Sequence, residues 1–299
     1  MICLCCGKEI VNEDNYWHKK CIKKFFSQSV LPALKINTDD ENIKKNIKVF
    51  VPGVQKKLSV HIDKDSDKRI SYYDEDSRYI IKLENDYKEI TVAEQVTMLM
   101  ANDFGIRTCE HGLIKVDNSY IYIVKRFDRE ETNKIHVEDF CQLSNKLTNS
   151  KYKGSYEQAG KIIDRYSEYK KLDKIELYKV VLFSFVTLNN DMHLKNFSLI
   201  EDKSIRLSPA YDLLPTKLFV EDGTDFALQL NGKDRNITKK DLIKFGQSLE
   251  INDKIINKII SDLTIKEESF ISIINNSLLS DSFKEKYIVE LTKRINILK

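Results

Sequence analysis

Residues 188–197 read Leu-Asn-Asn-Asp-Met-His-Leu-Lys-Asn-Phe, and residues 209–212 read Pro-Ala-Tyr-Asp. This stretch decides the fold because it orders a carboxylate, an amide and a second carboxylate along the chain: Asp191, Asn196 and Asp212. Between them, residues 197–200 and 205–207 have the pattern of two strands around a polar turn at residues 201–204. We expect this hairpin to bring Asn196 and Asp212 together.

The spacing of these residues has a chemical interpretation. Asp191 and Asn196 lie five positions apart, as do the catalytic Asp and the metal-binding Asn of the protein-kinase loop H-R-D-x-x-x-x-N. Phosphoryl transfer needs Mg²⁺ held by oxygen ligands and an aligned acceptor hydroxyl. Asp191 can take the proton of the acceptor, while Asn196 and Asp212 can bind metal, so the stretch predicts an ATP-dependent kinase. The open alternative is a turn that only ends the apolar run 180–188.

Length and charge permit such an enzyme. The chain has 299 residues, enough for two lobes, and its 49 basic residues nearly balance 46 acidic ones. This balance gives no general footprint for nucleic acid or membrane binding. No apolar segment reaches the roughly 18 residues of a membrane span, and the amino terminus lacks a signal-peptide core. We therefore expect a cytosolic protein.

Four of the six cysteines fall within the first 21 residues. The pairs Cys3-x-x-Cys6 and His18-x-x-Cys21 are joined by an eleven-residue connection, which suits a tetrahedral zinc site. Its role would be structural, because four protein ligands leave no position for a substrate. A redox C-x-x-C or loosely ordered thiols remain open, and Cys5 could replace Cys3 or Cys6.

This zinc-knuckle-like module is expected to span residues 1–36. Its aromatic residues Tyr16, Trp17, Phe25 and Phe26 would pack it onto the main body, and the polar stretch 37–48 would be a link. The two remaining cysteines, Cys109 and Cys141, are expected to be small buried groups.

A nucleotide-binding lobe is expected next, over residues 37–128. Residues 51–57, Val-Pro-Gly-Val-Gln-Lys-Lys, precede an alternating strand pattern. Gly53 would let backbone N–H groups approach a phosphate, and Lys56 or Lys57 could add charge. A hairpin turn with solvated lysines is the alternative.

Lys82 lies inside the apolar strand 79–83, where its charge would need a carboxylate or a phosphate. A helix follows, with apolar residues at helical spacing over 92–100 and Thr91 as its N-cap. Glu94 on this helix would pair with Lys82, as in protein kinases. Two alternatives stay open: Lys82 could extend to water, and Glu94 could form a capping box with Thr91.

Residues 120–128 predict a strand that runs into a linker between lobes. Phe127 could lie against an adenine ring whose edge bonds to the backbone of residues 125–127, or it could be a core residue. Beyond it, helices are expected over 139–147, 156–169, 174–187 and 239–298. The predicted fold is α+β, with a small β-rich lobe and a mostly helical lobe over residues 129–299.

In these residues the sequence resembles the HipA family of bacterial serine/threonine kinases, toxins of toxin-antitoxin modules with a kinase-like fold. Matching blocks run in family order from about residue 50 to about residue 215. They are P-G-V-Q-K-K-L-S (52–59), Y-I-I-K-L (79–83), K-R-F-D (125–128), E-D-F-C-Q (138–142), N-N-D-M-H-L-K-N-F-S (189–198) and L-S-P-A-Y-D-L-L-P (207–215).

The resemblance implies roles for individual residues. Asp191 would be the catalytic base, and Asn196 and Asp212 the Mg²⁺ ligands. ATP would be held by the phosphate loop, a lysine with its glutamate partner, the hinge and the catalytic loop. These residues are Pro52, Gly53, Val54, Gln55, Lys56, Lys57, Lys82, Glu94, Lys125, Arg126, Phe127, His193, Lys195, Asn196, Tyr211 and Asp212.

Two departures from the family pattern bear on partners and regulation. Only about fifty residues precede Gly53, so the chain is similar to short HipT-type relatives, and we expect a HipB-like DNA-binding antitoxin or a small HipS-like protein as partner. Pro52 and Phe50 stand where self-inactivating members carry serine in the phosphate loop. We therefore expect no autophosphorylation there, unless Ser59 or another hydroxyl substitutes.

The sequence is thus interpreted as a bacterial, cytosolic, ATP- and Mg²⁺-dependent serine/threonine kinase, the toxin of a toxin-antitoxin system. The family implies a translation-related substrate such as an aminoacyl-tRNA synthetase. The alternatives are transfer of AMP or phosphorylation of a small molecule, and a catalytically silent binding module in an antitoxin–DNA complex. Direct nucleic-acid binding by the N-terminal module is not expected, because the charges around it are mixed.

Overall fold

The computed structural model describes residues 1–11, 16–33, 57–62, 70–72, 77–84, 87–116, 118–130, 133–220 and 223–299. The predicted phosphate loop runs from Pro52 to Lys57, and all of it except Lys57 lies outside these ranges, as does the link at 37–48. Within the described ranges, no helix combines the length and the apolar character that a membrane crossing requires.

The first lobe is built on a five-stranded antiparallel sheet with the order β2-β1-β3-β5-β4. Its strands are β1 (Lys57–Ile62), β2 (Ile70–Tyr72), β3 (Tyr79–Lys82), β4 (His111–Val116) and β5 (Ser119–Lys125). Residues Ile81 and Ile123, paired across β3 and β5, are both fully buried. Because β3 is central, a residue at its end lies deep between sheet and helix.

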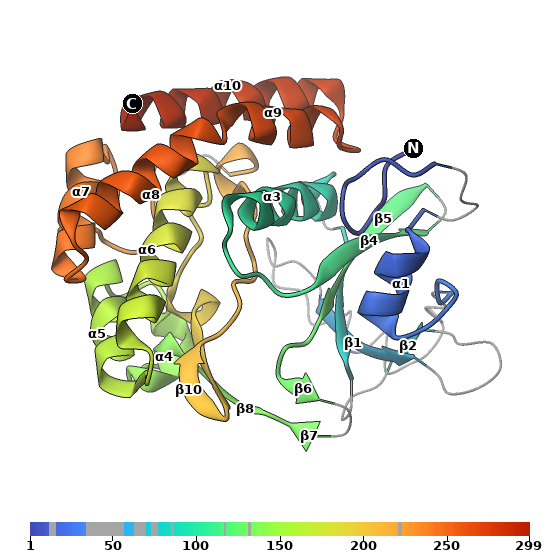
Figure 1. Ribbon diagram of the computed structural model, residues 1–299, viewed down its shortest axis with the longest axis horizontal. Coiled ribbons are helices and arrows are strands. Elements are labelled where there is room, and N and C mark those ends of the chain that lie inside the picture. Colours follow the sequence, from blue (N-terminus) through green and yellow to red (C-terminus); the bar gives the residue numbers. More distant parts are fainter. Residues whose placement is uncertain are drawn as a thin grey trace.

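Helix α3 (Ile90–Phe104) packs against β4 and β5 (Figure 1). Most of its residues are buried on both sides, so it is an interior helix rather than an amphipathic surface helix. The prediction that Thr91 is its N-cap was wrong, since the helix begins after Glu89 and the Thr91 hydroxyl donates to the Tyr120 carbonyl (2.8 Å). The Thr91 hydroxyl therefore bonds to β5 and does not cap the helix.

The second lobe is mostly helical. Its helices are α4 (Phe140–Leu143), α5 (Tyr156–Tyr166), α6 (Lys170–Val186), α7 (Lys239–Ser248), α8 (Asp253–Ile265), α9 (Glu267–Asn275) and α10 (Asp281–Leu298). Most residues of α6 are buried and form part of the core of this lobe. Helices α9 and α10 run along one edge of the molecule, and α9 also contacts α3 (Figure 1). The helix predicted over 139–147 is shorter, because Asn145 adopts a left-handed conformation (φ 54°).

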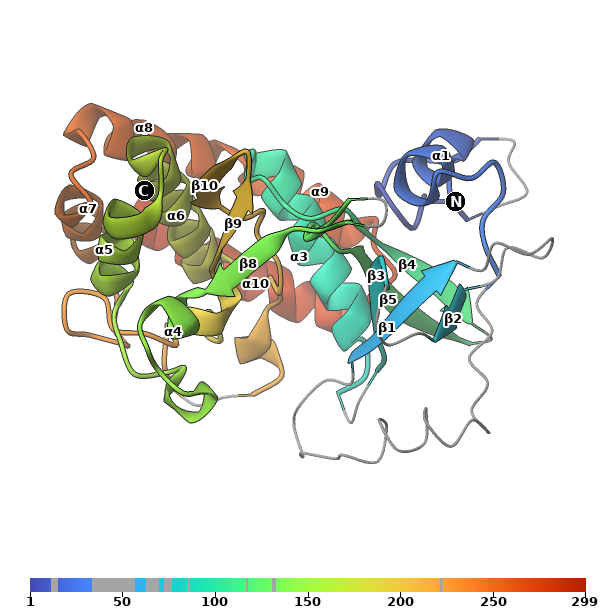
Figure 2. The same cartoon turned by 90° about the horizontal axis from the view of Figure 1, so that it is seen from below.

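The predicted hairpin after residue 196 is present. It consists of β9 (Ser198–Asp202) and β10 (Ser204–Leu207), and β8 (His136–Asp139) completes this sheet. The strands are longer than predicted, with Lys203 alone at the turn (φ 57°). Figure 2 shows β8 leaving the first lobe towards the second, after the short pair β6 (Arg129–Glu130) and β7 (Asn133–Lys134).

Residues 1–11 and 16–33 form a small N-terminal module with one helix, α1 (Lys19–Phe26), beside the first lobe (Figure 2). Trp17 is buried and its ring N–H donates to the Leu113 carbonyl of β4 (2.8 Å), while Phe25 stacks on Tyr79 of β3 (5.5 Å between centroids). Tyr16 departs from the prediction, because it is 37% exposed and contacts the polar end of Lys115 on the sheet instead of packing into the core. The buried aromatic residues therefore join module and lobe into one core.

Candidate functional site

Lys82 lies at the centre of the candidate active site. It ends β3, is only 4% exposed, and its ammonium pairs with Glu94 of α3 and with Asp212, which follows β10. The alternative in which Lys82 extends to water is therefore wrong, and Glu94 faces Lys82 rather than capping its own helix. One buried lysine thus connects sheet, helix and the second lobe.

The charges at this point favour the ionised forms of Lys82 and Asp212. Burial alone would raise the pKa of Asp212, but the neighbouring Lys57 and Lys82 outweigh it and hold that pKa well below its usual range. Burial likewise opposes protonation of Lys82, yet Asp212 and Glu94 raise its pKa. Burial raises the pKa of Glu94. The Asp212 carboxylate is therefore ionised although it is largely buried, and an ionised carboxylate is the form that could bind a cation.

Lys57 is the described end of the predicted phosphate loop. Its Nζ atom lies 2.9 Å from Oδ2 and 3.3 Å from Oδ1 of Asp212. This contact brings the start of β1 to the same carboxylate that Lys82 binds. Two cations therefore face the predicted metal position from the first lobe.

Asp191 and Asn196 are joined within one tight loop. The Asn196 amide nitrogen donates to the Asp191 carbonyl (2.9 Å), and a short 3-10 turn over Leu194–Asn196 makes this contact possible. The bond engages the nitrogen end of the amide, which leaves the oxygen end for a cation. Asn196 and Asp212 together offer hard oxygen donors of the kind that Mg²⁺ binds.

Asn189 ties this loop to Asp212. Its side-chain oxygen accepts from the Asp191 backbone N–H (3.2 Å), and its amide nitrogen donates to the Asp212 carbonyl (3.4 Å). Sequence reasoning missed this role, although Asn189 stands inside the quoted stretch. Asp212 also holds a left-handed backbone (φ 57°), which is unusual for a residue other than glycine.

Tyr152 is a residue of the site that the sequence patterns did not predict. Its hydroxyl donates to Oδ1 of Asp191 (2.7 Å), and its ring meets His193 edge-on at 5.0 Å. Tyr152 is 39 residues upstream of Asp191, so no local spacing could have revealed the pair. The two segments that carry Tyr152 and Asp191 are also joined by a backbone hydrogen bond, in which the Leu194 N–H donates to the Lys151 carbonyl (3.1 Å).

His193 itself is buried, which lowers its pKa and favours the neutral ring. Its Nδ1 atom is buried and has no hydrogen-bond partner within the described part of the chain. A buried polar atom of this kind normally has a partner. This is consistent with a nucleotide contact, the role that the resemblance implies for His193.

Tyr211 connects the catalytic loop to the hinge. Its hydroxyl hydrogen-bonds to Ser198 (2.6 Å) and donates to the Lys195 carbonyl (2.9 Å), while its ring stacks on Phe127 (5.8 Å between centroids). The Lys195 side chain pairs with Asp139 (2.6 Å). Phe127 therefore faces the loop that carries Asp212.

The hinge itself differs in part from the predicted arrangement. The backbone N–H groups of Lys125 and Arg126 donate to the carbonyls of Glu110 and Arg78 (both 2.8 Å). Their side chains pair with Glu110 and Asp128 instead of approaching the other predicted site residues. Of the three predicted hinge residues, Phe127 stacks on Tyr211, in the loop that carries Asp212.

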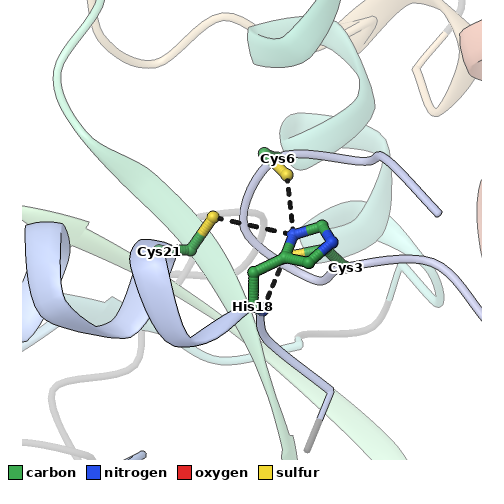
Figure 3. Close-up of side chains that lie close together, drawn as sticks. All are labelled: Cys3, Cys6, His18 and Cys21. Carbon is green, nitrogen blue, oxygen red and sulfur yellow. Dashed lines mark hydrogen bonds between the residues drawn. The ribbon is translucent and has the colours of Figure 1, made fainter. Parts of the chain in front are cut away.

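The predicted metal ligands of the N-terminal module also converge (Figure 3). One ligand atom each from Cys3, Cys6, His18 and Cys21 lies within 4.8 Å of every other. His18 Nδ1 is 3.4 Å from Cys6 Sγ and 3.9 Å from Cys21 Sγ. A tetrahedral zinc site with Zn–S near 2.3 Å and Zn–N near 2.0 Å requires S···N separations of roughly 3.5 Å.

The surroundings orient His18 as a ligand. Its Nε2 lies 3.0 Å from the Glu9 carbonyl, which can only accept, so Nε2 carries the proton and Nδ1 keeps a lone pair towards the sulfurs. A hydrogen bond with the Cys6 thiol lowers the pKa of Cys3 to about 4. Gly7 turns the chain after Cys6 with φ 68°. Cys109 and Cys141 are buried elsewhere, as predicted.

This architecture, two lobes with a Lys82–Glu94 pair between sheet and helix, defines a kinase-like protein. The chain belongs to the HipA-like C-terminal domain family, whose model matches residues 49–269. The structure also resembles that of a Shewanella oneidensis MR-1 toxin-antitoxin system, HipA and HipB with operator DNA. That match has a TM-score of 0.70 and 18% identity, and covers 96% of this chain and 79% of the other.

A second solved structure, the Helicobacter pylori proinflammatory kinase CtkA, matches with a TM-score of 0.57 and 17% identity over 81% of this chain and 95% of that chain. Sequence relatives are named as kinases. "Putative kinase Y4dM" of Sinorhizobium fredii is 30% identical over 60% of this chain, and the match spans only 47% of that relative. A Haemophilus influenzae "Putative kinase" is 25% identical over 83% of this chain and 81% of its own length.

Proposed function

We propose that this chain is an ATP- and Mg²⁺-dependent serine/threonine protein kinase of HipA type. The observation that carries the proposal is Lys82, buried between Glu94 of α3 and Asp212 of the second lobe. Active protein kinases need this lysine–glutamate pair together with the metal-binding aspartate. The family membership and the names of the relatives support the same activity.

Each residue has a role in the proposed step. Asp191 accepts the proton of a serine or threonine hydroxyl, whose oxygen forms a bond to the γ-phosphorus of ATP as the bond to the leaving ADP breaks. Lys82 would hold the phosphates, and Asn196 and Asp212 would hold Mg²⁺. When bound, Mg²⁺ would neutralise charge on the phosphates. Phe127 lies against the base, and His193 and Lys195 complete the nucleotide site.

The biological setting is proposed from relatives. The chain would act in the bacterial cytosol as the toxin of a toxin-antitoxin system, on a translation-related protein such as an aminoacyl-tRNA synthetase. The S. oneidensis structure contains HipB and operator DNA, which supports a HipB-like partner here. A HipS-like protein is the second candidate partner.

The Cys3, Cys6, His18 and Cys21 cluster is proposed to hold one structural Zn²⁺. Its support is the convergence of the four ligand atoms to within 4.8 Å of one another and the orientation of His18 by the Glu9 carbonyl. Four protein ligands fill the coordination sphere, so the zinc ion has no open position for a substrate. It would therefore not contact the phosphates, unlike the proposed Mg²⁺.

Labelling with ATP tests the proposed reaction. The purified protein is incubated with Mg²⁺, a bacterial lysate and ATP labelled at either the α- or the γ-phosphate. We expect γ-label on serine or threonine of a lysate protein, and a loss of roughly 100-fold or more in Asp191→Asn. The control is Asp202→Asn, an exposed carboxylate on β9.

The other outcomes identify the alternatives. Label from the α-phosphate would show AMP transfer, and γ-label on a small molecule would show a different acceptor. No Asp191-dependent label from either nucleotide would reject the kinase and favour a silent binding module.

A further inference from the structure

The N-terminal module holds α3 through one buried side chain. Gln95 of α3 donates from Nε2 to the carbonyls of Leu4 (3.2 Å) and Cys5 (3.0 Å). Both carbonyls belong to the turn between the proposed zinc ligands Cys3 and Cys6. Binding of one metal ion by both cysteines would fix the shape of this turn, and with it the direction of the two carbonyls.

The same side chain extends the connection into the sheet. Because Gln95 Nε2 donates to two carbonyls, its Oε1 must be the acceptor for His111 Nδ1 (2.7 Å). His111 Nε2 then accepts from Asn102 of α3 (3.1 Å). Module, helix α3 and strand β4 are therefore linked by one network in which every buried group can be satisfied.

Close packing leaves the module little freedom on this surface. A Cβ atom on Gly7 would lie 2.9 Å from Leu99 of α3, and a Cβ atom on Gly112 of β4 would lie 2.5 Å from Trp17. Both contacts are closer than side chains tolerate. The metal-binding turn thus lies directly on α3 and β4.

Glu94, the neighbour of Gln95 in the sequence, projects about 100° away around the helix and pairs with Lys82. Any rotation or shift of α3 that changes Gln95 must also move Glu94. An open pocket of about 800 Å³ lies beside this contact, between the module, α3 and α9, lined by Gln95, Leu99, Asn102 and Ile273 among others. The hydrogen bonds of Gln95 therefore hold α3 against the module beside this pocket.

We propose that metal bound by Cys3, Cys6, His18 and Cys21 clamps α3 through Gln95, and so keeps Glu94 paired with Lys82. The metal-loaded protein is the competent kinase, and loss of the metal releases α3 and uncouples the pair. This rests on the proposed kinase function and on the proposed zinc site. It gives the module a regulatory role at the active site rather than a role as a separate domain.

Three measurements on purified full-length protein test the clamp: zinc per chain, hydrogen exchange of the α3 amides, and phosphoryl transfer. Cys6→Ser and Cys21→Ser should lose zinc, and their α3 amides should exchange about tenfold faster, as expected when one or two buried hydrogen bonds are lost. Transfer should fall by about the same factor. Gln95→Met should keep zinc and still show both changes.

The controls separate a clamp from general destabilisation. Cys141→Ser removes a buried thiol of the second lobe, and Gln247→Met changes an exposed glutamine of α7. Both should match the wild type in all three measurements. Adding Glu94→Gln to Gln95→Met should lower transfer no further than Glu94→Gln alone, because both changes act on one pair.

The results that would contradict the clamp differ from those that would contradict the kinase proposal. Wild-type protein without zinc would overturn the clamp while leaving the labelling result intact. If the wild type transfers no phosphoryl group, the kinase proposal fails, and hydrogen exchange still decides whether metal holds α3. Unchanged exchange in Gln95→Met and in the cysteine variants would also overturn the clamp.

Discussion

At the scale of single residues, three hydrogen bonds fix the position of Asp191. Its backbone N–H donates to Asn189, its carbonyl accepts from Asn196, and its Oδ1 accepts from the Tyr152 hydroxyl. The first two contacts set the backbone, and the third sets the carboxylate. With Oδ1 occupied by Tyr152, Oδ2 is the oxygen left for an acceptor hydroxyl. Tyr152 is therefore a positioning residue for the proposed base.

Tyr152→Phe should lower kcat about tenfold, because it removes one hydrogen bond to a carboxylate without changing the ring. The KM for ATP should stay unchanged, since the substitution removes only the hydroxyl that contacts Asp191 and keeps the ring that packs against His193. Steady-state kinetics measure this split. Tyr169→Phe, a tyrosine 45% exposed at the start of α6, is the control. A faster Tyr152→Phe enzyme would contradict the assignment and show that the hydroxyl blocks the acceptor position.

At the scale of elements, α3 has two functional faces. Glu94 faces Lys82, and the successive residue Gln95 faces the module. The sequence predicted the helix from its apolar spacing, and the Lys82–Glu94 pair from the lysine–glutamate arrangement of protein kinases. It did not predict the hydrogen bonds of Thr91, Asn189 and Tyr152, since these bonds join residues of different elements or loops. Local pattern gives elements, but hydrogen bonds between distant segments depend on the complete fold.

His111 makes the docking of α3 on β4 sensitive to pH. Burial lowers the pKa of His111 to about 3, below the roughly 6.5 of an exposed histidine. The unfolded chain therefore binds a proton that the folded chain excludes, and stability falls as pH drops below about 6.5. We predict that His111 alone lowers the free energy of unfolding by about 2 kcal/mol when the pH falls from 7 to 5.

Urea unfolding at both pH values measures this cost. His111→Gln should lose less stability between pH 7 and pH 5 than the wild type by about that amount. His136→Gln, at an exposed histidine of β8, should behave as the wild type does. An equal pH dependence in all three proteins would exclude His111 as the cause.

At the scale of the whole molecule, the lobes are joined beside the site. The Ala210 N–H donates to the Arg107 carbonyl (2.7 Å), and the Cys109 N–H donates to the Ala210 carbonyl (3.0 Å). Two residues further, Asp212 meets Lys82 of the first lobe. A nucleotide that contacts Lys82 and Asp212 would therefore bind both lobes of the folded chain at once. Such a ligand stabilises the entire protein by mass action.

ATP with Mg²⁺ at about 100 times its Kd should raise Tm by roughly 5 °C. The rise should disappear without Mg²⁺ and in Asp212→Asn, each variant being compared with its own Tm without ligand. Asp191→Asn should keep the full rise while losing transfer, because Asp191 serves the acceptor and not the nucleotide. Thermal unfolding with and without ligand thus separates the two aspartates. A full rise in Asp212→Asn would remove Asp212 from the nucleotide site, and no rise in Asp191→Asn would place that residue among the nucleotide contacts.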